Sequence, residues 1–557
     1  MKVAQWRWWR QVADVATHVL VAAIVLLALL LLPRPAGAAS AGGSASTPYL
    51  NGVISVNGPN FAFPEPFLFD SEGRAVLLHG VNAVYKRAPY ELYAAPGKAW
   101  NFDAADARAM ARLGFNVVRL GILWQGIEPG TLGPNNPAIC TPGTPHDPGQ
   151  WNSSVADAYL ARVEQTVNLL GRYHIYTLLD MHQDVYSQLF RGEGAPAWAV
   201  CTDGHPIKAL PGRWSNNYAN PGLNAAFQNF WNNDVVGDLQ GEYDRSWAAV
   251  ATAFAGNPWV IGYDPINEPF TTRLSPTPTT FIDTQLECFY TGLAKPGIID
   301  GQPADCPPDD PEQGVISSIE TADSRHLIFR EPTIFASHGL PNEVGAMDFP
   351  NLVLNFHDYC SFRSGVTGNP YDLTACLSQE DRTFFLRTGE RSSVVSNPQP
   401  HGLPLMMSEF GATQSASLIA GVTATANQAV SSWIYWSWKY YDDPTGSSSE
   451  AMVNDNGTLR PIARALAQTY PQAVAGSPLL IVFNPRNGAF YFSYTSNGAI
   501  TAPTLIWMSL RYYYPSGYCA TASAGSITSA AGAQVLKVQN PPAGGPIVVR
   551  VHAGQCR

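Results

Sequence analysis

One stretch of the chain runs from an apolar, strand-like segment directly into a polar turn: Val260-Ile261-Gly262-Tyr263-Asp264-Pro265-Ile266-Asn267-Glu268-Pro269. Apolar runs of similar length recur along the chain and are rich in Val, Ile, Leu and aromatic residues, as buried parallel strands are. We predict eight such strands, at residues 76–81, 116–120, 176–180, 260–267, 326–330, 352–356, 405–409 and 433–438. Helical patterns, such as residues 104–113 and 156–173, precede several of them. This alternation predicts an α/β fold, a (β/α)8 TIM barrel.

The chain is also long enough for a second domain. Its 557 residues are 46% hydrophobic and 14% charged, which is ample for one large core and a smaller one. Beyond residue 470 the pattern changes to short alternating strands broken by Gly, Pro and Asn. We therefore predict a barrel over residues 48–470 and a small C-terminal all-β sandwich over residues 471–557. Residues 67–74 read as a strand entering a tight turn and predict a hairpin at the bottom of the barrel.

The N-terminal residues carry an export pattern. Basic residues precede the unbroken apolar run 19–32, and the small residues Ala36-Gly37-Ala38-Ala39 follow it. This order is typical of a signal peptide and predicts that residues 1–39 are cleaved from a secreted protein. Counted from Val12, the same segment could instead serve as an uncleaved membrane anchor. An extracytoplasmic location is expected in both cases.

Eight cysteines form four couples that are close in the sequence. None has the spacing of a CxxC or CxxH metal site, and an even number in an exported chain favours disulfides. Eight cysteines allow many connectivities, and buried free thiols are the alternative. From proximity we expect the pairs Cys140/Cys201, Cys288/Cys306, Cys360/Cys376 and Cys519/Cys556.

The charge of the chain argues against a nucleic-acid partner. The net charge is −10, and the chain has no basic run beyond the N-terminal Lys2, Arg7 and Arg10. The 15 Trp, 24 Tyr and 24 Phe provide flat apolar faces that can stack on sugar rings, although most will fill the core. We expect a monomer without a cofactor, although the residues leave the oligomeric state open.

Two carboxylates stand at the ends of two predicted strands. Glu268 follows the fourth strand, and Glu409 ends the seventh, within Ser408-Glu409-Phe410-Gly411. The active site of such a barrel lies at the C-terminal ends of its strands, so both side chains should face one pocket. Retaining glycoside cleavage needs one protonated carboxyl and one ionised carboxylate about 5 to 5.5 Å apart. The pattern predicts a retaining β-glycosidase.

The two carboxyl groups need different pKa values for these two roles. Arg119 ends the second predicted strand, and we expect it beside Glu409, where it would favour the ionised form. Glu409 is then the nucleophile and Glu268 the acid/base. An Arg119 nearer to Glu268, or carboxyls more than about 7 Å apart, would contradict this assignment.

Other predicted strand ends carry imidazole, phenol, amide or indole groups. Such groups can bond sugar hydroxyls, orient the carboxylates or stack on a pyranose. Each one alone has a simpler explanation as a core or structural residue, and their concurrence at the ends of several strands is what favours a common site. They are His79 and Asn82 after the first strand, His182 and Asp184 after the third, His357 and Tyr359 after the sixth, and Trp436 on the eighth.

In this order the residues resemble glycoside hydrolase family five, whose pattern is an Arg, a His, an Asn-Glu pair, a His-x-Tyr, a Glu and a Trp. The resemblance spans the whole barrel and implies that Glu268 is the acid/base and Glu409 the nucleophile. It also implies that Asn267 binds the sugar 2-hydroxyl and that His182 lines the sugar site. The residues expected to hold the nucleophile are Arg119, His357 and Tyr359.

Residues 80–86 and 180–187 are similar, within that family, to the endoglycoceramidases and related glycosylceramidases. Those enzymes pair the barrel with a C-terminal β-sandwich and cleave the bond between a glycan and ceramide. The likeness implies that Lys86 and Asp184 contact the sugar nearest the lipid, and that the protein contacts a membrane surface to reach its substrate. An apolar groove beside the site should hold the lipid, with candidate wall residues Leu189, Phe190, Trp198, Phe281, Phe289 and Phe335. The same residues could equally pack against the barrel, and the sequence does not separate the two cases.

Several alternatives remain open on the residues alone. A glucosylceramidase or steryl β-glucosidase would share the chemistry with a shorter sugar pocket, and an exported endo-β-glucanase or mannanase would have an open cleft. A metal-dependent hydrolase could use His79, His182, Asp184, His357 and Asp358, but no tight ligand spacing supports it, so we expect no metal. A binding protein that kept only the fold is the remaining class.

Overall fold

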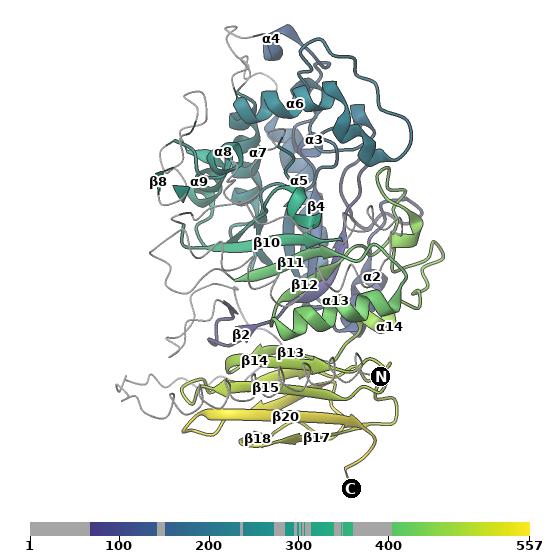
Figure 1. The fold of residues 1–557 in the computed structure, drawn as a ribbon, viewed down its shortest axis with the longest axis vertical. Coiled ribbons are helices and arrows are strands. Elements are labelled where there is room, and N and C mark those ends of the chain that lie inside the picture. The colour runs from purple at the N-terminus through teal and green to yellow at the C-terminus, as the bar shows by residue number, and fades with distance from the viewer. Residues whose placement is uncertain are drawn as a thin grey trace, which may run out of the picture. The chain divides into compact units, whose positions relative to one another are not determined.

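The computed structural model of the chain describes residues 67–141, 151–233, 238–271, 284–293, 298–299, 302–303, 306, 313–338, 347, 349–359 and 404–556. The barrel and the C-terminal strands belong to one compact unit (Figure 1). The barrel is closed, and its eight strands follow the order β10-β11-β12-β3-β4-β5-β6-β9. Every neighbouring pair is parallel, as the sequence predicts. The strands are β3 (His79–Ala83), β4 (Val117–Ile122), β5 (Tyr176–Met181), β6 (Val260–Asp264), β9 (Leu327–Arg330), β10 (Leu352–Asp358), β11 (Leu405–Phe410) and β12 (Ser432–Tyr435).

Several barrel strands change from apolar to polar residues along one face. Side chains two residues apart share a face of a strand, and the apolar residue of each pair lies in one buried cluster, while the polar residue lies nearer the C-terminal end. The polar residues are buried as well, so the apolar layer supports a polar layer at the mouth. The pairs are Val117/Arg119, Leu178/Asp180, Phe329/Glu331 and Val353/Asn355.

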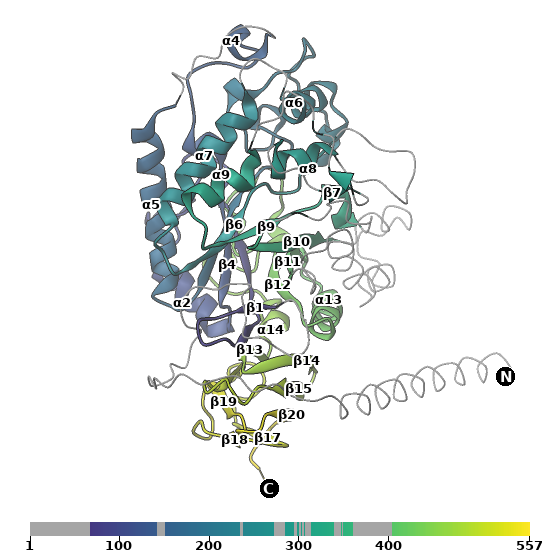
Figure 2. The ribbon, with the colours of Figure 1, turned by 90° about the vertical axis from the view of Figure 1, so that its left-hand side faces the viewer.

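Helices surround the barrel (Figure 2). The predicted helix 104–113 forms as α2 (Ala104–Leu113), where Asp103 caps the first turn and Gly114 ends the helix with a φ of 87°. The predicted helix 156–173 forms as α5 (Ser153–Gly171), three residues earlier because Asn152 accepts a hydrogen bond from the Val155 amide. The other helices are α3 (Trp124–Ile127), α4 (Pro137–Cys140), α6 (Pro221–Asn232), α7 (Leu239–Phe254), α8 (Thr284–Thr291), α9 (Gly314–Ala322), α13 (Ala416–Gln428) and α14 (Ala463–Leu466).

Three predicted strand boundaries were wrong by three residues. The first barrel strand begins at His79 rather than at residue 76, because Ala75 and Val76 form β2, which pairs with β1 and β13 in another sheet. The fourth ends at Asp264 rather than at residue 267, because Pro265 has no N–H to continue the ladder. The eighth strand ends at Tyr435 rather than at residue 438. The shift of the first strand places His79 at the N-terminal end of the barrel, away from the mouth, whereas Asn267 still lies beyond the C-terminal end of its strand.

The C-terminal residues form the predicted β-sandwich from two antiparallel sheets. Their facing sides share one core, which contains Tyr470 and Ile506 from one sheet and Phe492 and Val549 from the other. The four-stranded sheet holds β14 (Gly476–Phe483), β15 (Phe490–Ser496), β20 (Gly545–Ala553) and β17 (Tyr518–Ala522), and β7 (Ile298–Ile299) and β8 (Gln302–Pro303) form a separate hairpin. The six-stranded sheet holds β1 (Leu68–Phe69), β2 (Ala75–Val76), β13 (Tyr470–Val474), β16 (Thr504–Trp507), β19 (Val535–Gln539) and β18 (Ser526–Ile527). The hairpin predicted at residues 67–74 is thus β1–β2, and it pairs with the C-terminal strands.

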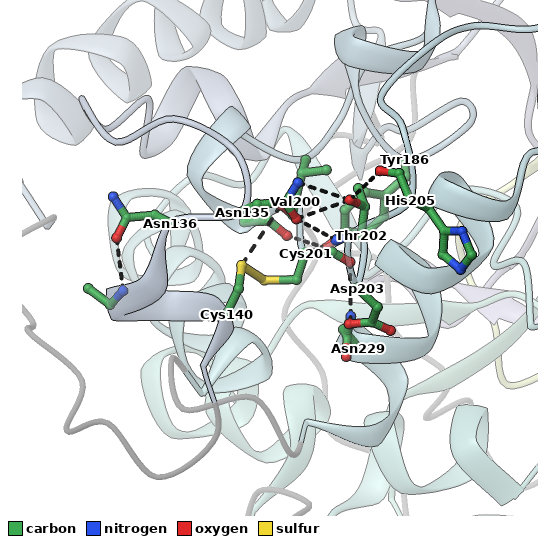
Figure 3. The surroundings of a disulfide bond; sticks show 12 residues. Asn135, Asn136, Cys140, Tyr186, Val200, Cys201, Thr202, Asp203, His205 and Asn229 are labelled. Carbon is green, nitrogen blue, oxygen red and sulfur yellow. Dashed lines mark hydrogen bonds between the residues drawn. A yellow bond between two sulfur atoms is a disulfide. The ribbon is translucent and has the colours of Figure 1, made fainter.

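Three of the expected cysteine pairs are disulfides, namely Cys140–Cys201, Cys288–Cys306 and Cys519–Cys556. Figure 3 shows Cys140 joined to Cys201 beside the Asn135 and Thr202 hydrogen bonds. The expected pair Cys360/Cys376 and the predicted N-terminal export segment lie outside the described residues. Within the described ranges, no helix is both long and apolar enough to cross a bilayer.

Candidate functional site

Of the ten residues singled out for a catalytic or sugar-binding role, nine lie at or just beyond the C-terminal ends of barrel strands, and Arg119 lies in the middle of its strand. The ten residues come from seven different strands, and all but Tyr359 are buried. Lys86 follows β3, Arg119 lies in β4, His182 and Asp184 follow β5, Asn267 and Glu268 follow β6, His357 and Tyr359 lie in or after β10, Glu409 lies in β11, and Trp436 follows β12.

Glu268 and Glu409 face each other across one imidazole. A carboxylate oxygen of each and a ring nitrogen of His357 all lie within 4.8 Å of one another. The His357 Nδ1 atom is 2.9 Å from Glu268 Oε1 and 3.7 Å from Glu409 Oε2. The Ser337 hydroxyl donates to the same Glu268 oxygen at 3.2 Å. His357 therefore contacts the predicted acid/base more closely than the predicted nucleophile it was expected to hold.

Arg119 lies beside Glu409, as the strand order predicts. Its Nη1 atom is 2.5 Å from Glu409 Oε1, and no contact to Glu268 is formed within the described part of the chain. The Tyr359 hydroxyl donates to the other oxygen, Oε2, at 2.5 Å. Both oxygens of Glu409 are thus held by a donor, which fixes the direction in which the carboxylate points.

The pKa of Glu409 differs from the expectation drawn from Arg119. Burial raises it to about 7, and the charges of His357 and Arg119 together with the Tyr359 hydrogen bond offset this only in part. The sequence indicates the charged neighbours but not the depth of the carboxylate, which is 4% exposed. Desolvation is consequently the dominant influence on this group.

Glu331 is a central residue that the sequence analysis missed. It follows β9, and its Oε1 atom is 2.9 Å from Arg119 Nη2 and 3.0 Å from His357 Nε2. Its Oε2 atom accepts the backbone amide of Glu268 at 2.8 Å. Burial alone would raise its pKa, but His357 and Arg119 lower it to about 2. Glu331 therefore ties together the groups that contact both candidate catalytic carboxylates.

His357 and Arg119 are the cations of this acidic centre. Burial would lower the pKa of His357, yet Glu331 first and Glu409 second raise it well above its ordinary value, so the ring is protonated. The Arg119 guanidinium also contacts Asp180 at 2.9 Å. The further partners of Arg119 are Asp264 at 2.8 Å, Asn267 at 2.9 Å and Asn82 at 3.3 Å.

The backbone at Glu268 is held in an uncommon conformation. Glu268 has a φ of 41°, in the left-handed region that non-glycine residues rarely occupy. The Gln183 side chain donates to the carbonyls of Asn267 and Glu268 at 2.9 and 3.0 Å. Strain of this kind persists where the surroundings fix it, and it is concentrated at functional sites.

A stacked pair of rings forms one wall of the site. The His182 imidazole lies parallel to the Trp436 indole, with centroids 5.4 Å apart. Burial, with Lys86 second, lowers the pKa of His182 well below its usual value, so the ring is neutral. Its Nδ1 atom is 2.7 Å from Asp180, and its Nε2 atom has no hydrogen-bond partner among the described residues. This nitrogen can therefore bond a ligand hydroxyl.

Lys86 also lies over the Trp436 ring. Its ammonium lies 4.7 Å from the indole centroid and 2.5 Å from Asp184. The same nitrogen donates to the Thr445 hydroxyl at 2.7 Å and lies 3.5 Å from Glu193. Burial raises the pKa of Glu193 well above its ordinary value, and the Lys86 charge offsets this only in part. Glu193 and Thr445 belong to loops and carry no strand-end signal in the sequence.

Two family models match the sequence that forms this site and the C-terminal domain. The model of the cellulase family, glycosyl hydrolase family 5, matches residues 70–442, and the model of the glycoside hydrolase family 5 C-terminal domain matches residues 468–551. The chain belongs to glycosyl hydrolase family 5. This family 5 protein is accordingly a glycosyl hydrolase, with the additional C-terminal domain.

Three named relatives of this family 5 chain that align over more than four-fifths of its length are endoglycoceramidases. It is 28% identical over 508 residues to endoglycoceramidase I of Rhodococcus hoagii, covering 87% of this chain and 86% of the relative. It is 27% identical over 483 residues to an endoglycoceramidase of Cyanea nozakii, covering 82% and 85%. Among solved structures, endo-glycoceramidase II from Rhodococcus sp. in its ganglioside GM3 complex aligns with a TM-score of 0.68 at 26% identity. That alignment covers 88% of this chain and all of the other.

Two clusters of this family 5 site have side chains of the kinds that ligate metals. One comprises His182, Asp184 and Glu193, and the other comprises Glu268, His357 and Glu409. In the first cluster the Lys86 ammonium already lies among the carboxylates and supplies the positive charge that a cation would bring. In the second the protonated His357 has the same effect. The donor sets therefore suit bound cationic side chains better than a metal ion.

Two predictions about neighbouring residues were wrong. His79 lies at the start of β3, stacked between Trp433 and Tyr470 at centroid distances of 4.0 and 3.7 Å, so it is a core residue at the opposite end of the barrel from the site. Of the proposed lipid-groove residues, Phe190, Trp198 and Phe289 are fully buried in the main core. Leu189 and Phe335 are half-buried against that core, and Phe281 lies outside the described residues.

Proposed function

We propose that this enzyme is a retaining β-glycosidase with Glu409 as the nucleophile and Glu268 as the acid/base. One observation carries the proposal. A carboxylate oxygen of Glu268, one of Glu409 and a ring nitrogen of His357 all lie within 4.8 Å of one another. Carboxyl groups of retaining enzymes stand about 5 to 5.5 Å apart, whereas inverting enzymes leave room for a water between theirs. Arg119 and Tyr359 on Glu409 support its role as the nucleophile, because they stabilise a carboxylate.

In the first step, Glu409 attacks the anomeric carbon while Glu268 gives its proton to the departing glycosidic oxygen. The Tyr359 hydroxyl and the Arg119 guanidinium aim the attacking carboxylate. Glu268 receives its orientation from His357 and from Ser337. The products are the free aglycone and a glycosyl ester on Glu409.

In the second step, the Glu268 carboxylate takes a proton from water, which attacks the same carbon and releases the sugar with its original anomeric configuration. Asn267 is suited to bond the sugar 2-hydroxyl, because Arg119 and the Gln183 carbonyl fix its amide beside Glu268. Hydrogen bonds at this hydroxyl strengthen in the transition state.

We propose a glycosphingolipid as the substrate, cleaved between the glycan and ceramide. Support comes from the endoglycoceramidase relatives, which align over more than four-fifths of the chain, and from the neighbour solved with ganglioside GM3. Trp436, His182 and Lys86 form a polar wall with one flat ring, which suits the sugar that precedes the lipid. Asp184 and Glu193 add carboxyl groups beside this wall.

We further propose that the enzyme works outside the cytoplasm as a monomer that contacts a membrane surface. The three disulfides support an oxidising compartment. A ceramide substrate is held in a bilayer, so the site must reach that surface.

The test is to incubate the enzyme separately with a ganglioside, glucosylceramide and a soluble β-glucan, and to identify the products by mass spectrometry. An intact oligosaccharide released together with free ceramide supports the proposal. Release of glucose from glucosylceramide alone would favour a glucosylceramidase, and glucan fragments alone a polysaccharidase. Glu409→Gln should be inactive on all three substrates, while Glu164→Gln on the exposed face of α5 provides a matched active control.

A further inference from the structure

A second cavity lies at the other end of the barrel. It has a volume of about 670 Å³ and is lined by residues from α2 and α5, including their C-terminal ends, and from the strands β16 and β19. Phe115 and Asn116, which precede β4, form part of its floor, whereas Glu268 and Glu409 lie at the C-terminal ends of the strands. Its polar and aromatic wall consists of Arg108, Arg112, Arg172, Tyr173, Trp507 and Arg511.

The four arginines of this cavity carry no paired carboxylate among the described residues. Arg108 donates to the Tyr173 hydroxyl at 3.5 Å, and the Arg511 guanidinium lies 5.4 Å from the centre of the Tyr512 ring. Like charges gathered around one cavity repel each other. This cluster of arginines stands in a chain that has more acidic than basic residues and a net charge of −10. A local excess of this kind favours the binding of an anion.

Helix ends explain only part of the cluster. Arg112 lies in the last turn of α2 and Arg172 caps α5, where a cation stabilises the helix dipole. Arg511 follows β16 in the C-terminal sandwich, and Arg108 lies in the middle of α2, so neither stands at a helix end. Their convergence on the same cavity needs another reason.

Trp507 adds a flat aromatic face to the cavity. Its Nε1 atom is buried without a hydrogen-bond partner in the described part of the chain. The indole packs against Gly114, where a Cβ would lie 2.3 Å from that nitrogen. Aromatic faces such as Trp507 and Tyr173 suit a sugar ring, and the guanidinium fork matches the oxygens of a phosphate or carboxylate.

We propose that this cavity binds a sugar ring that bears a phosphate or carboxylate group. The volume is within the range of small-molecule sites. Arg108, Arg112 and Arg172 come from the barrel, and Arg511 and Trp507 come from the sandwich. The ligand therefore bridges the two parts and stabilises their contact. This site is separate from the glycosidase site and does not depend on the proposed function.

The test measures the thermal unfolding midpoint and calorimetric binding of the full chain with glucose 6-phosphate, glucuronate, inorganic phosphate and uncharged glucose, each at the same ionic strength. Glucose 6-phosphate or glucuronate should raise the midpoint by at least about 2 °C at saturation, and glucose should not. Vesicles of phosphatidylcholine with and without phosphatidylinositol distinguish a lipid head group from a free sugar as the source.

Arg511→Gln should weaken anion binding at least about tenfold, since one charge-assisted contact is lost. Arg486→Gln, an exposed arginine of the sandwich outside the cavity, is the matched control and should bind as the wild type does. The proposal is overturned if none of the anions stabilises the protein more than sodium chloride and no vesicle binds in an Arg511-dependent manner. Equal effects of the two substitutions would overturn it as well.

Discussion

Arg119 Nη1 lies 2.5 Å from Glu409 Oε1, while Nη2 of the same guanidinium lies 2.9 Å from Glu331 Oε1. One buried cation thus links the candidate nucleophile to the carboxylate that also contacts His357 and the Glu268 amide. The orientation of both catalytic groups depends on this shared centre.

Glu268→Gln removes the proposed proton donor and later base. Turnover of a glycolipid should fall by roughly 10² to 10⁴. A glycosyl fluoride needs no proton on its leaving group, so formation of the glycosyl-enzyme from it should be much less affected. Hydrolysis of the glycosyl-enzyme should be slow, so this intermediate should accumulate. Stopped-flow and steady-state rates on both substrates check this. Equal losses in the first step with both substrates would contradict the role of Glu268.

Tyr359→Phe should move the acidic limb of the pH profile upward. Glu409 must be ionised to attack, and with its pKa raised to about 7 by burial, kcat/KM should fall as the pH drops below that value. The Tyr359 hydrogen bond lowers this pKa, so its loss raises the pKa and shifts the limb to higher pH. The profile is measured with a fluoride substrate. A shift to lower pH would contradict Glu409 as the group that titrates.

Glu331→Gln should destabilise the fold as well as the site. The substitution leaves Arg119 and His357 without a buried partner charge, and removing one member of such a pair costs about 3 to 5 kcal/mol. The pKa of His357 should also fall, because Glu331 is the largest influence that raises it. Urea unfolding and the NMR titration of His357 measure the two effects. An unchanged His357 titration would show that Glu331 does not set its charge.

Replacing Cys140 and Cys201 together by serine should lower stability by roughly 2 to 4 kcal/mol, since this bridge closes a loop with a sequence separation of 61. The kcat should change little, because neither cysteine touches the catalytic carboxylates. Thermal unfolding and initial rates test the two statements. Removing Cys519–Cys556, whose separation is 37, should cost less in the same assay. A reversed order would show that native-state contacts outweigh loop closure.

The sequence predicts most of the barrel and its mouth because both follow from local pattern. Apolar runs identify the strands, and polar residues at their ends identify Glu268, Glu409 and Arg119. Glu331 sits by the same logic one residue beyond a predicted strand and could have been found there. His79 was misplaced because a three-residue shift in the start of β3 moves it to the far end of the barrel.

Features that depend on tertiary packing could not be predicted from the sequence. Glu193 and Thr445 reach Lys86 from two loops, and loop geometry is not encoded in a periodic pattern. Phe190 and Trp198 could equally have lined a groove, and only the packing shows that they fill the core. The depth of Glu409, which decides its pKa, likewise depends on groups from several strands.

The most direct test is to incubate the enzyme with a 2-deoxy-2-fluoro glycoside that has a good leaving group, and to map the labelled peptide by mass spectrometry. The electron-withdrawing fluorine slows hydrolysis of the glycosyl-enzyme, so the intermediate accumulates. The proposed mechanism predicts one sugar attached to the Glu409 side chain. A sugar on any other residue, or product of inverted anomeric configuration without a covalent intermediate, would contradict it.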